Sequence, residues 1–370
     1  MPHDPYKALY IHLPFCKHRC AYCDFATQAI APDSPAIDEY IDGLIMDVRR
    51  KAKEGELAAI ETVYIGGGTP SYVGQKRLSS LLYALGVSMN LTPEVECSME
   101  ANPESLTPEL IRDVYALGVN RLSIGVQSFD DGLLKTLDRI HDSARAEAAV
   151  RAALERFENV SIDLMCGIPG QTPDMFLADL RKAVDLGVTH VSVYPLTIED
   201  HTPFRRMVDS GELEDVNEEH EALMMGMAPN VLGEAGFHRY EVASYAKDGY
   251  ECRHNKAYWT GVPYLGLGAS AVTMTQNESR RMRVQDGEVV DDLNRRQMCA
   301  EDLMMKMRMC AGVSEEEVRK AALLLPGVLD VFRGLVRDNL VRRENGRYMP
   351  TLGGWLLGNE LYGRIFELAP

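Results

Sequence analysis

The chain has 370 residues, 46% of them apolar and 25% charged, a composition that excludes a disordered, collagen-like or disulfide-stapled protein. Its 39 Lys and Arg residues against 55 Asp and Glu residues give a formal net charge of −16, which disfavours nucleic acid as a partner. No run approaches 18 consecutive apolar residues, and the first residues lack the pattern of a signal peptide. We therefore expect no membrane span and a cytoplasmic protein whose eight cysteines are reduced or metal-bound.

Short β-branched runs alternate with longer amphipathic segments over the first 200 residues. Two of the predicted helices end in Leu-Gly-Val, where glycine is the expected residue after a helix. Repeated strand–helix units predict parallel strands with right-handed crossovers, in an open doubly wound sheet or a curved one. Six units are too few for a complete eight-stranded barrel, so we favour an α/β fold with a partial (β/α)6 TIM-type barrel. The predicted strands are 8–14, 62–68, 94–100, 120–127, 159–165 and 190–196, and the predicted helices are 35–53, 75–88, 107–117, 144–157 and 173–186.

The pattern changes after the sixth unit. A helix is predicted at 216–236 and a strand at 237–246, whereas 247–290 reads as irregular and polar. From about residue 291 the chain reads as a small helical region ending in a hairpin at Asn345-Gly346. The sequence thus predicts a barrel over 1–236, an extension over 237–290 and a small winged-helix-like domain over 291–370.

Three cysteines, Cys16, Cys20 and Cys23, directly follow the first predicted strand with the spacing Cys-x3-Cys-x2-Cys. Structural zinc sites and iron–sulfur clusters normally use four ligands, and no second cysteine pair exists here. Three thiolates would leave one iron of a cluster open to an outside ligand. The competing interpretation is three incidental or zinc-binding cysteines, which the rarity of cysteine and the tight spacing disfavour.

This triplet, with Tyr22 just before its last cysteine, resembles the signature of radical S-adenosylmethionine (SAM) proteins. The resemblance implies a [4Fe-4S] cluster whose open iron binds SAM, and reductive cleavage of SAM to a 5′-deoxyadenosyl radical. The cofactors would carry the chemistry, and the protein would position them and exclude water. It also implies an electron donor for the cluster.

Further segments are similar to the SAM-contacting segments of the oxygen-independent coproporphyrinogen III oxidase-like branch of that family. Gly66-Gly67-Gly68-Thr69-Pro70 alone could be a tight turn, since it fits neither a P-loop nor a dinucleotide fingerprint. Polar residues near strand ends could each be solvated termini, although the carboxyl ends of parallel strands are where ligands bind. By the resemblance, the SAM-contacting residues are Gly67, Gly68, Thr69, Glu100, Gln127, Arg139 and Asp163, and Tyr10 and Tyr22 pack near the cluster.

Two features point to one group within the branch. The coproporphyrinogen dehydrogenases carry another cysteine two residues after the third, and here that position is Phe25. Residues 254–259 read His-Asn-Lys-Ala-Tyr-Trp, which resembles the His-Asn-x-x-Tyr-Trp motif of the haem chaperones of the branch. The resemblance implies haem as cargo, contact through His254, conceivably with Cys252, and a haem-acceptor protein as partner. A packed, hydrogen-bonded histidine is the alternative for His254.

The sequence leaves the chemistry open between two classes. One is a haem-binding and transfer protein, and the other is a radical SAM enzyme that acts on a tetrapyrrole or transfers methyl groups. The catalytic residues of such an enzyme are unknown. The methionines between Met298 and Met309, the flanking His12 and His18, and the acidic run 218–221 are interpreted as core packing, ordinary histidines and a solvated helix face.

Overall fold

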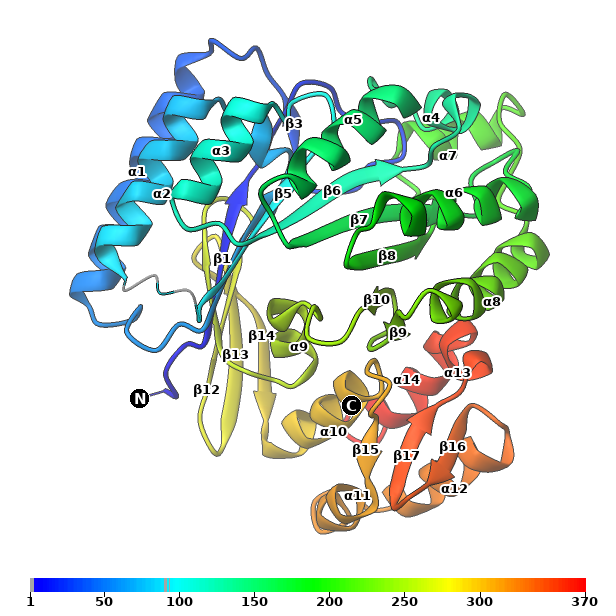
Figure 1. Ribbon diagram of the computed structural model, residues 1–370. Helices are drawn as coiled ribbons and strands as arrows, with labels where there is room; N and C mark the ends of the chain where they lie inside the picture. Colours follow the sequence, from blue (N-terminus) through cyan, green and yellow to red (C-terminus); the bar gives the residue numbers. More distant parts are fainter. Residues whose placement is uncertain (1–2, 90–91, 93) are drawn as a thin grey trace.

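The computed structural model describes residues 3–89, 92 and 94–370. Within this part, six parallel strands lie side by side in chain order. Because the order never reverses, the unit is wound in one direction, and Figure 1 shows the following helices along the outside of the curved sheet. The strands are β1 (Ala8–Leu13), β4 (Thr62–Gly67), β5 (Glu96–Ala101), β6 (Arg121–Gln127), β7 (Asn159–Cys166) and β8 (His190–Pro195).

The helices of this unit begin and end at the signals that the sequence carries. Thr107 and Thr172 cap the starts of two of them, and Gly187 ends one in the left-handed region with a φ of 86°. The helices are α1 (Pro35–Lys53), α2 (Gln75–Ser88), α3 (Pro108–Ala116), α4 (Asp131–Thr136), α5 (Ser143–Leu154), α6 (Pro173–Leu186), α7 (Pro203–Asp209) and α8 (Glu218–Glu234), with short pieces β2 (Phe15–Cys16), β3 (Gln28–Ala29) and η1 (Pro70–Tyr72). The apolar faces of all but α4 and α7 pack on the strands in one continuous core, and those two helices contribute to a separate smaller cluster.

The sheet continues beyond the six parallel strands at both ends and does not close. In the described residues its order is β14-β13-β12-β11-β1-β4-β5-β6-β7-β8-β10-β9, so β14 and β9 form open edges. The predicted partial barrel is therefore confirmed, and the doubly wound alternative is excluded. No described helix is both long enough and apolar enough to cross a lipid bilayer.

Two predictions for the region after α8 are wrong. The single strand expected at 237–246 is two short antiparallel strands, β9 (His238–Arg239) and β10 (Ser244–Ala246). The segment expected to be irregular forms α9 (Arg253–Trp259) and four strands: β11 (Tyr264–Leu267), β12 (Val272–Gln276), β13 (Arg280–Gln285) and β14 (Glu288–Asn294). Strand β11 pairs with β1 in parallel, and β12 to β14 add an antiparallel edge whose polar composition hides its strand pattern.

The C-terminal region is a helical unit with a small sheet. The predicted hairpin is confirmed, because Asn345 and Gly346 turn between β16 and β17 with φ values of 50° and 73°. A winged-helix-like character stays a prediction. The elements are α10 (Arg295–Lys306), β15 (Val313–Ser314), α11 (Glu315–Ala321), α12 (Val328–Arg337), β16 (Val341–Glu344), β17 (Arg347–Pro350), α13 (Leu352–Leu356) and α14 (Gly358–Phe366).

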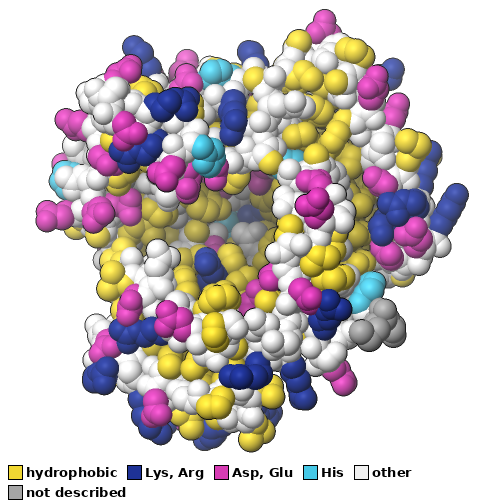
Figure 2. All heavy atoms as spheres, turned by 180° about the vertical axis from the view of Figure 1, so that it is seen from behind, with side chains coloured by type: hydrophobic (Ala, Val, Ile, Leu, Met, Phe, Trp, Pro, Cys, Tyr) yellow, Lys and Arg dark blue, Asp and Glu magenta, His cyan; other side chains and the backbone are white. Residues whose placement is uncertain are grey.

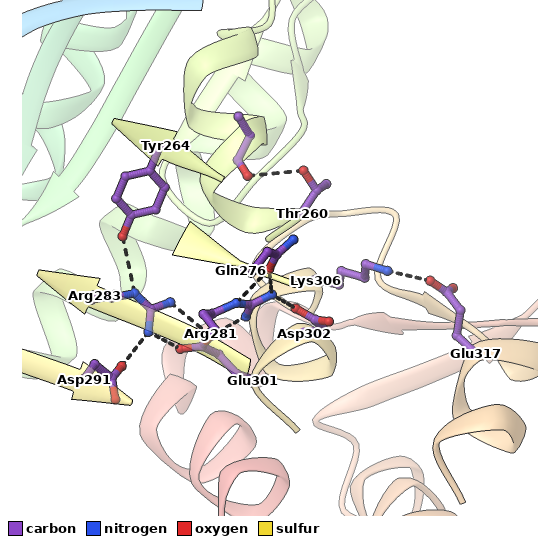
Figure 3. A network of polar contacts seen from close by, with 11 residues as sticks. Thr260, Tyr264, Gln276, Arg281, Arg283, Asp291, Glu301, Asp302, Lys306 and Glu317 are labelled. Carbon is purple, nitrogen blue, oxygen red and sulfur yellow. Dashed lines mark hydrogen bonds and ion pairs between the residues drawn. The ribbon is translucent and has the colours of Figure 1, made fainter. Parts of the chain in front are cut away.

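A buried ion network joins this region to the sheet extension (Figure 3). Arg281 of β13 is 2% exposed and bonds to Glu301 and Asp302 of α10. Arg283 also donates to Glu301, at 2.9 Å, and to the hydroxyl of Tyr264. Removing one partner of such a network leaves a buried charge uncompensated, so the network fixes α10 against β13.

Candidate functional site

The cysteine loop leaves the carboxyl end of β1 and returns beside it. Strands β2 and β3 pair in parallel, with Phe15 opposite Gln28 and Cys16 opposite Ala29. The pairing fixes both ends of the loop that carries the second and third cysteines. A turn within the loop is closed by the amide of Cys23, which donates to the carbonyl of Cys20 at 3.1 Å.

The three cysteine sulfurs surround one side of an open cavity. Cys16 is buried, whereas Cys20 and Cys23 are half-buried. Burial raises the pKa of the Cys16 and Cys20 thiols, and a coordinating metal would reverse this by deprotonating them. Polar side chains lie near all three sulfurs: Thr69 Oγ1 is 3.5 Å from Cys16, an Arg139 nitrogen is 3.7 Å from Cys20, and Thr27 Oγ1 is 3.9 Å from Cys23.

The glycine segment at the end of β4 lies directly against the cysteine loop. Gly67 has a φ of 112°, and a Cβ there would lie 2.5 Å from the ring of His12. A Cβ on Gly68 would lie 2.7 Å from the carbonyl oxygen of Phe15. The amides of Gly68 and Thr69 donate to Leu13 and Phe15, both at 2.8 Å. The missing side chains thus let this backbone pack against the strand that leads into Cys16.

Two carboxylates point into the barrel from neighbouring parts of the sheet. Glu100 of β5 accepts hydrogen bonds from the Tyr64 hydroxyl at 2.9 Å and from the Gly67 amide at 3.1 Å. Burial raises the pKa of Glu100 to about 7, although the bond from Tyr64 opposes this shift. Asp163 of β7 accepts from the Ser123 hydroxyl at 3.3 Å, and burial raises its pKa as well. Perturbed carboxyl groups in a cavity are typical of functional sites.

Gln127 is turned into the cavity by a β-bulge. The pairing of β6 with β7 shifts register between Gly125 and Gln127, and Gln127 has a φ of 66°. A left-handed conformation is uncommon for a residue other than glycine and is concentrated at functional sites. Arg139 follows α4, and its guanidinium donates to the Gly125 carbonyl at 2.8 Å and to Asn102 Oδ1 at 2.9 Å.

A cavity of about 470 Å³ brings most of the predicted site residues together. Figure 2 shows a face of the molecule that is hollowed near its middle, with hydrophobic side chains on the walls and both signs of charge around them. The predicted residues in the lining of the cavity are Cys16, Cys20, Tyr22, Cys23, Gly67, Gly68, Thr69, Glu100, Gln127, Arg139 and Asp163. Sequence reasoning did not assign Asn102, Ser123, Gly125 or Met165, which also line it.

Tyr10 lies outside this lining. Its hydroxyl is 2.9 Å from His12 Nδ1, and its ring stacks on Tyr64 within the barrel. Tyr10 is therefore not part of the cavity wall, and the prediction that it packs near the cluster stays a prediction. His12 reaches the loop instead, because its Nε2 is 2.9 Å from the Ala26 carbonyl oxygen.

His254 lies at the opposite end of the barrel from the cavity. Its Nδ1 is 2.9 Å from the hydroxyl of Thr62, which begins β4, whereas the cavity lies where β4 ends. Its Nε2 is 3.3 Å from the Tyr258 hydroxyl, and its ring stacks on Tyr64. The side chain is 1% exposed, and burial lowers its pKa to about 3. In this conformation both ring nitrogens have internal partners, as the alternative interpretation of a packed histidine expects, and haem contact through His254 stays a prediction.

Cys252 is also enclosed. It is completely buried, and its Sγ lies 3.5 Å from the carboxylate of Glu96, which also accepts the amide of His254 at 3.0 Å. Trp259, the last residue of the motif, donates from Nε1 to Glu241 at 3.1 Å. His254 and Trp259 of the motif are thus hydrogen-bonded to side chains of β4 and of the segment between β9 and β10.

The donor set around the cavity fits a cluster with an open iron. Among the described residues, no three His, Cys, Asp or Glu side chains are close enough together to hold a single metal ion. Three sulfurs spread around an open cavity match a multi-iron cluster better than a closed tetrahedral zinc site. The backbone at Gly67 and Gly68 and the polar residues at the strand ends lie beside the sulfurs and leave space for a second, smaller ligand.

Comparison with known proteins agrees with this geometry. Residues 10–183 match the family model of the Radical SAM superfamily. The protein named haem chaperone HemW from Bacillus subtilis is 33% identical over 96% of this chain and 98% of its own length. The protein of the same name from Mycobacterium tuberculosis is 35% identical over 94% of both chains, and that from Escherichia coli is 37% identical over 72% of this chain and 70% of its own.

The fold is shared with a solved structure as well. Coproporphyrinogen III oxidase (HemN) from Escherichia coli, described as a radical SAM enzyme, aligns with a TM-score of 0.80 at 20% identity. The alignment covers 98% of this chain and 90% of that one, so the resemblance in fold extends past the barrel to the C-terminal region. With relatives of at least 30% identity aligned over nearly its whole length, the chain belongs to the HemW family of the radical SAM superfamily.

Proposed function

We propose that this chain is a haem chaperone that holds a [4Fe-4S] cluster and SAM, binds haem and delivers it to an acceptor protein. The observation that carries the proposal is the identity of 33% to a protein named haem chaperone over 96% of this chain. We also propose that it works in the cytoplasm, which its free cysteine thiols support.

Phe25 supports the same proposal from the site. It lies on the rim of the cavity with 69% of its surface exposed, at the position where the coproporphyrinogen dehydrogenases carry a further cysteine. A thiol at this rim would face an incoming substrate, whereas a phenyl ring offers only an apolar contact. The haem acceptor and an electron donor for the cluster are the protein partners that this function requires.

The residues that line the cavity would bind the two cofactors in different ways. Cys16, Cys20 and Cys23 would hold the cluster, which when bound supplies single electrons to SAM. The backbone at Gly67 and Gly68 would lie against SAM. Glu100, Gln127, Arg139 and Asp163 would supply the polar groups that fix SAM at the strand ends, in a cavity that the half-buried Tyr22 also lines.

The test is reconstitution of the protein with iron and sulfide under anaerobic conditions, followed by titration with haem. We expect broad visible absorption from the cluster and a saturable Soret band from bound haem. Mixing with a haem-free b-type haemoprotein should then move that band to the acceptor. Failure to bind haem, or binding without transfer, contradicts the proposal.

A second candidate is a radical SAM enzyme that acts on a tetrapyrrole or transfers a methyl group. One observation favours it: the cysteine thiols, the glycine segment at the end of β4 and the two carboxylates line the same cavity. The reduced, reconstituted protein would be incubated with SAM and coproporphyrinogen III. Formation of 5′-deoxyadenosine together with decarboxylated product would establish this activity, and formation of neither excludes the decarboxylase.

The position of haem on the protein is open to a direct test. His254 is the residue that the sequence proposes for haem contact, yet its ring is enclosed at the amino end of the barrel. We expect His254→Ala to keep the Soret band of the wild-type protein. Loss of the band in a variant that still holds its cluster would show that α9 opens to bind haem.

A further inference from the structure

Asn102 connects two of the three cysteine sulfurs through its side-chain amide. Its Nδ2 donates to Thr69 Oγ1 at 3.0 Å, and Thr69 Oγ1 donates to Cys16 Sγ at 3.5 Å. Its Oδ1 accepts from Arg139 at 2.9 Å, and the other terminal nitrogen of Arg139 is 3.7 Å from Cys20 Sγ. The contacts form one chain from the first cysteine to the second.

The chemistry of the partners fixes the direction of every bond in this chain. Arg139 can only donate, so the amide oxygen of Asn102 must face it, and the amide nitrogen must face Thr69. The Thr69 hydroxyl therefore accepts from Asn102, and its own proton is free to point at Cys16. When the sulfurs are iron-bound thiolates they can only accept, which suits both donors.

The backbone around Asn102 holds its side chain in place. Its amide donates to Ser71 Oγ at 3.2 Å, and its carbonyl accepts from the amides of Ser105 and Leu106, both at 3.1 Å. A Cβ on Gly125 would lie 2.9 Å from Asn102 Oδ1, so the glycine provides the space for the bond to Arg139.

Hydrogen bonds to the sulfurs of an iron–sulfur cluster are among the factors that set its reduction potential. We propose that Asn102 is a positioning residue that orients Thr69 and Arg139 toward the cluster ligands. By doing so it raises the reduction potential of the cluster. This inference rests on the cluster that the family implies, and it is independent of whether the chain carries haem.

The substitution Asn102→Asp tests the direction of the bonds. A carboxylate still accepts from Arg139, but it also accepts the proton of the Thr69 hydroxyl, which then turns its lone pairs toward the Cys16 sulfur. Asn102→Leu removes both bonds without adding charge, and it separates the effect of the bonds from that of the negative charge.

The measurement is a redox titration of the reconstituted full-length protein, followed by electron paramagnetic resonance of the reduced cluster. For Asn102→Asp we expect the ratio of reduced to oxidised cluster at a fixed potential to fall about tenfold, or about 59 mV for one electron. Asn102→Leu should lower the ratio in the same direction by less. In a Thr69→Val background, Asn102→Asp should have a smaller effect than in the wild type.

Asn120 offers the matched control. It is another side-chain amide next to β5, just before β6 begins, and it bonds the backbone of Cys97 and Val95, each at 2.8 Å, away from the cavity lining. Asn120→Asp should leave the potential unchanged. An unchanged potential in both Asn102 variants, or an equal shift in Asn120→Asp, overturns the inference.

Loss of assembly is also decisive. If neither Asn102 variant assembles a cluster while Asn120→Asp does, Asn102 is a folding residue and the inference is overturned. If the wild-type protein assembles no cluster, the proposed function fails instead, so the two failures are distinguishable.

Discussion

The cysteine loop and helix α9 both carry short motifs rich in reactive side chains, but they lie at opposite ends of the barrel and their polar atoms have different partners. At the carboxyl end of the strands, the sulfurs and carboxylates line an open cavity. At the amino end, His254 bonds to Thr62 and Tyr258, and Cys252 lies against Glu96.

The two regions thus differ in whether their polar atoms face a cavity or have partners within the protein. A side chain that binds a ligand must face an open space, and Cys20 and Gln127 both line the cavity. Both ring nitrogens of His254, in contrast, have hydrogen-bond partners inside the protein. The two regions should therefore respond differently to substitution.

The largest expected effect is in the cysteine loop. Cys20→Ser removes one of only three thiolate ligands, so we expect the reconstituted protein to lose its cluster almost completely. Iron and sulfide analysis with visible absorption measures this. Cys299→Ser, in α10, is the matched control and should assemble a normal cluster. Retention of a full cluster by Cys20→Ser would mean that another side chain supplies the ligand.

The next effect is expected at α9, on stability rather than on the cluster. His254→Ala removes a buried ring and leaves the Thr62 hydroxyl without its partner, which should cost about 2–4 kcal/mol of unfolding free energy. Chemical denaturation measures the loss. Lys256→Ala on the same helix should change stability much less. A His254→Ala protein as stable as the wild type would show that the internal bonds of the ring contribute little.

A smaller effect concerns pH. Because burial lowers the pKa of His254 from 6.5 to about 3, the folded protein keeps this ring neutral while the unfolded chain protonates it. The contribution of His254 to stability is thus complete above pH 6.5 and is lost as the pH falls toward 3. His254→Gln should flatten the fall in stability on acidification by up to about 1.4 kcal/mol per pH unit. Parallel stability curves for the two cluster-free proteins would contradict this.

The smallest effect is expected at the rim of the cavity. Phe25 is 69% exposed, so Phe25→Ser should change the unfolding free energy by no more than about 0.5 kcal/mol. Cluster content should also be unchanged, because the side chain is not a ligand. Thermal unfolding and iron analysis check both. A large loss of stability would mean that the ring is buried against another part of the protein in solution.

Much of the barrel was predictable from local pattern. Each strand run is followed by a helix whose start and end signals are visible, as at Thr172 and Gly187. The extension was missed because β13 and β14 are polar and pair with each other rather than with an apolar core. One signal was present, since Asp286-Gly287 turns between them with φ values of 49° and 85°.

Some residues of the candidate site could likewise be predicted from local sequence, and others could not. Cysteine spacing and the polar residues at strand ends could be recognised because they lie within short motifs. The bulge that turns Gln127 and the contact of Asn102 with two distant side chains depend on tertiary packing, which no local pattern encodes. Asn102 had one local signal, its place before Pro103 and two residues after Glu100, the end of the predicted strand. The enclosure of His254 depends on Thr62, far away in the chain.

The pairing of β1 with both β4 and β11 has a consequence for how the protein is made. Ala8 pairs with Thr62 on one side and with Tyr264 on the other. Until the ribosome has produced β11, the strand that leads into the cysteine loop is an unprotected sheet edge, and such edges promote aggregation. The long sequence separation of this contact also favours slow folding. The sheet beside the cysteine loop is therefore completed only when β11, far downstream of the cysteines in the chain, has been made.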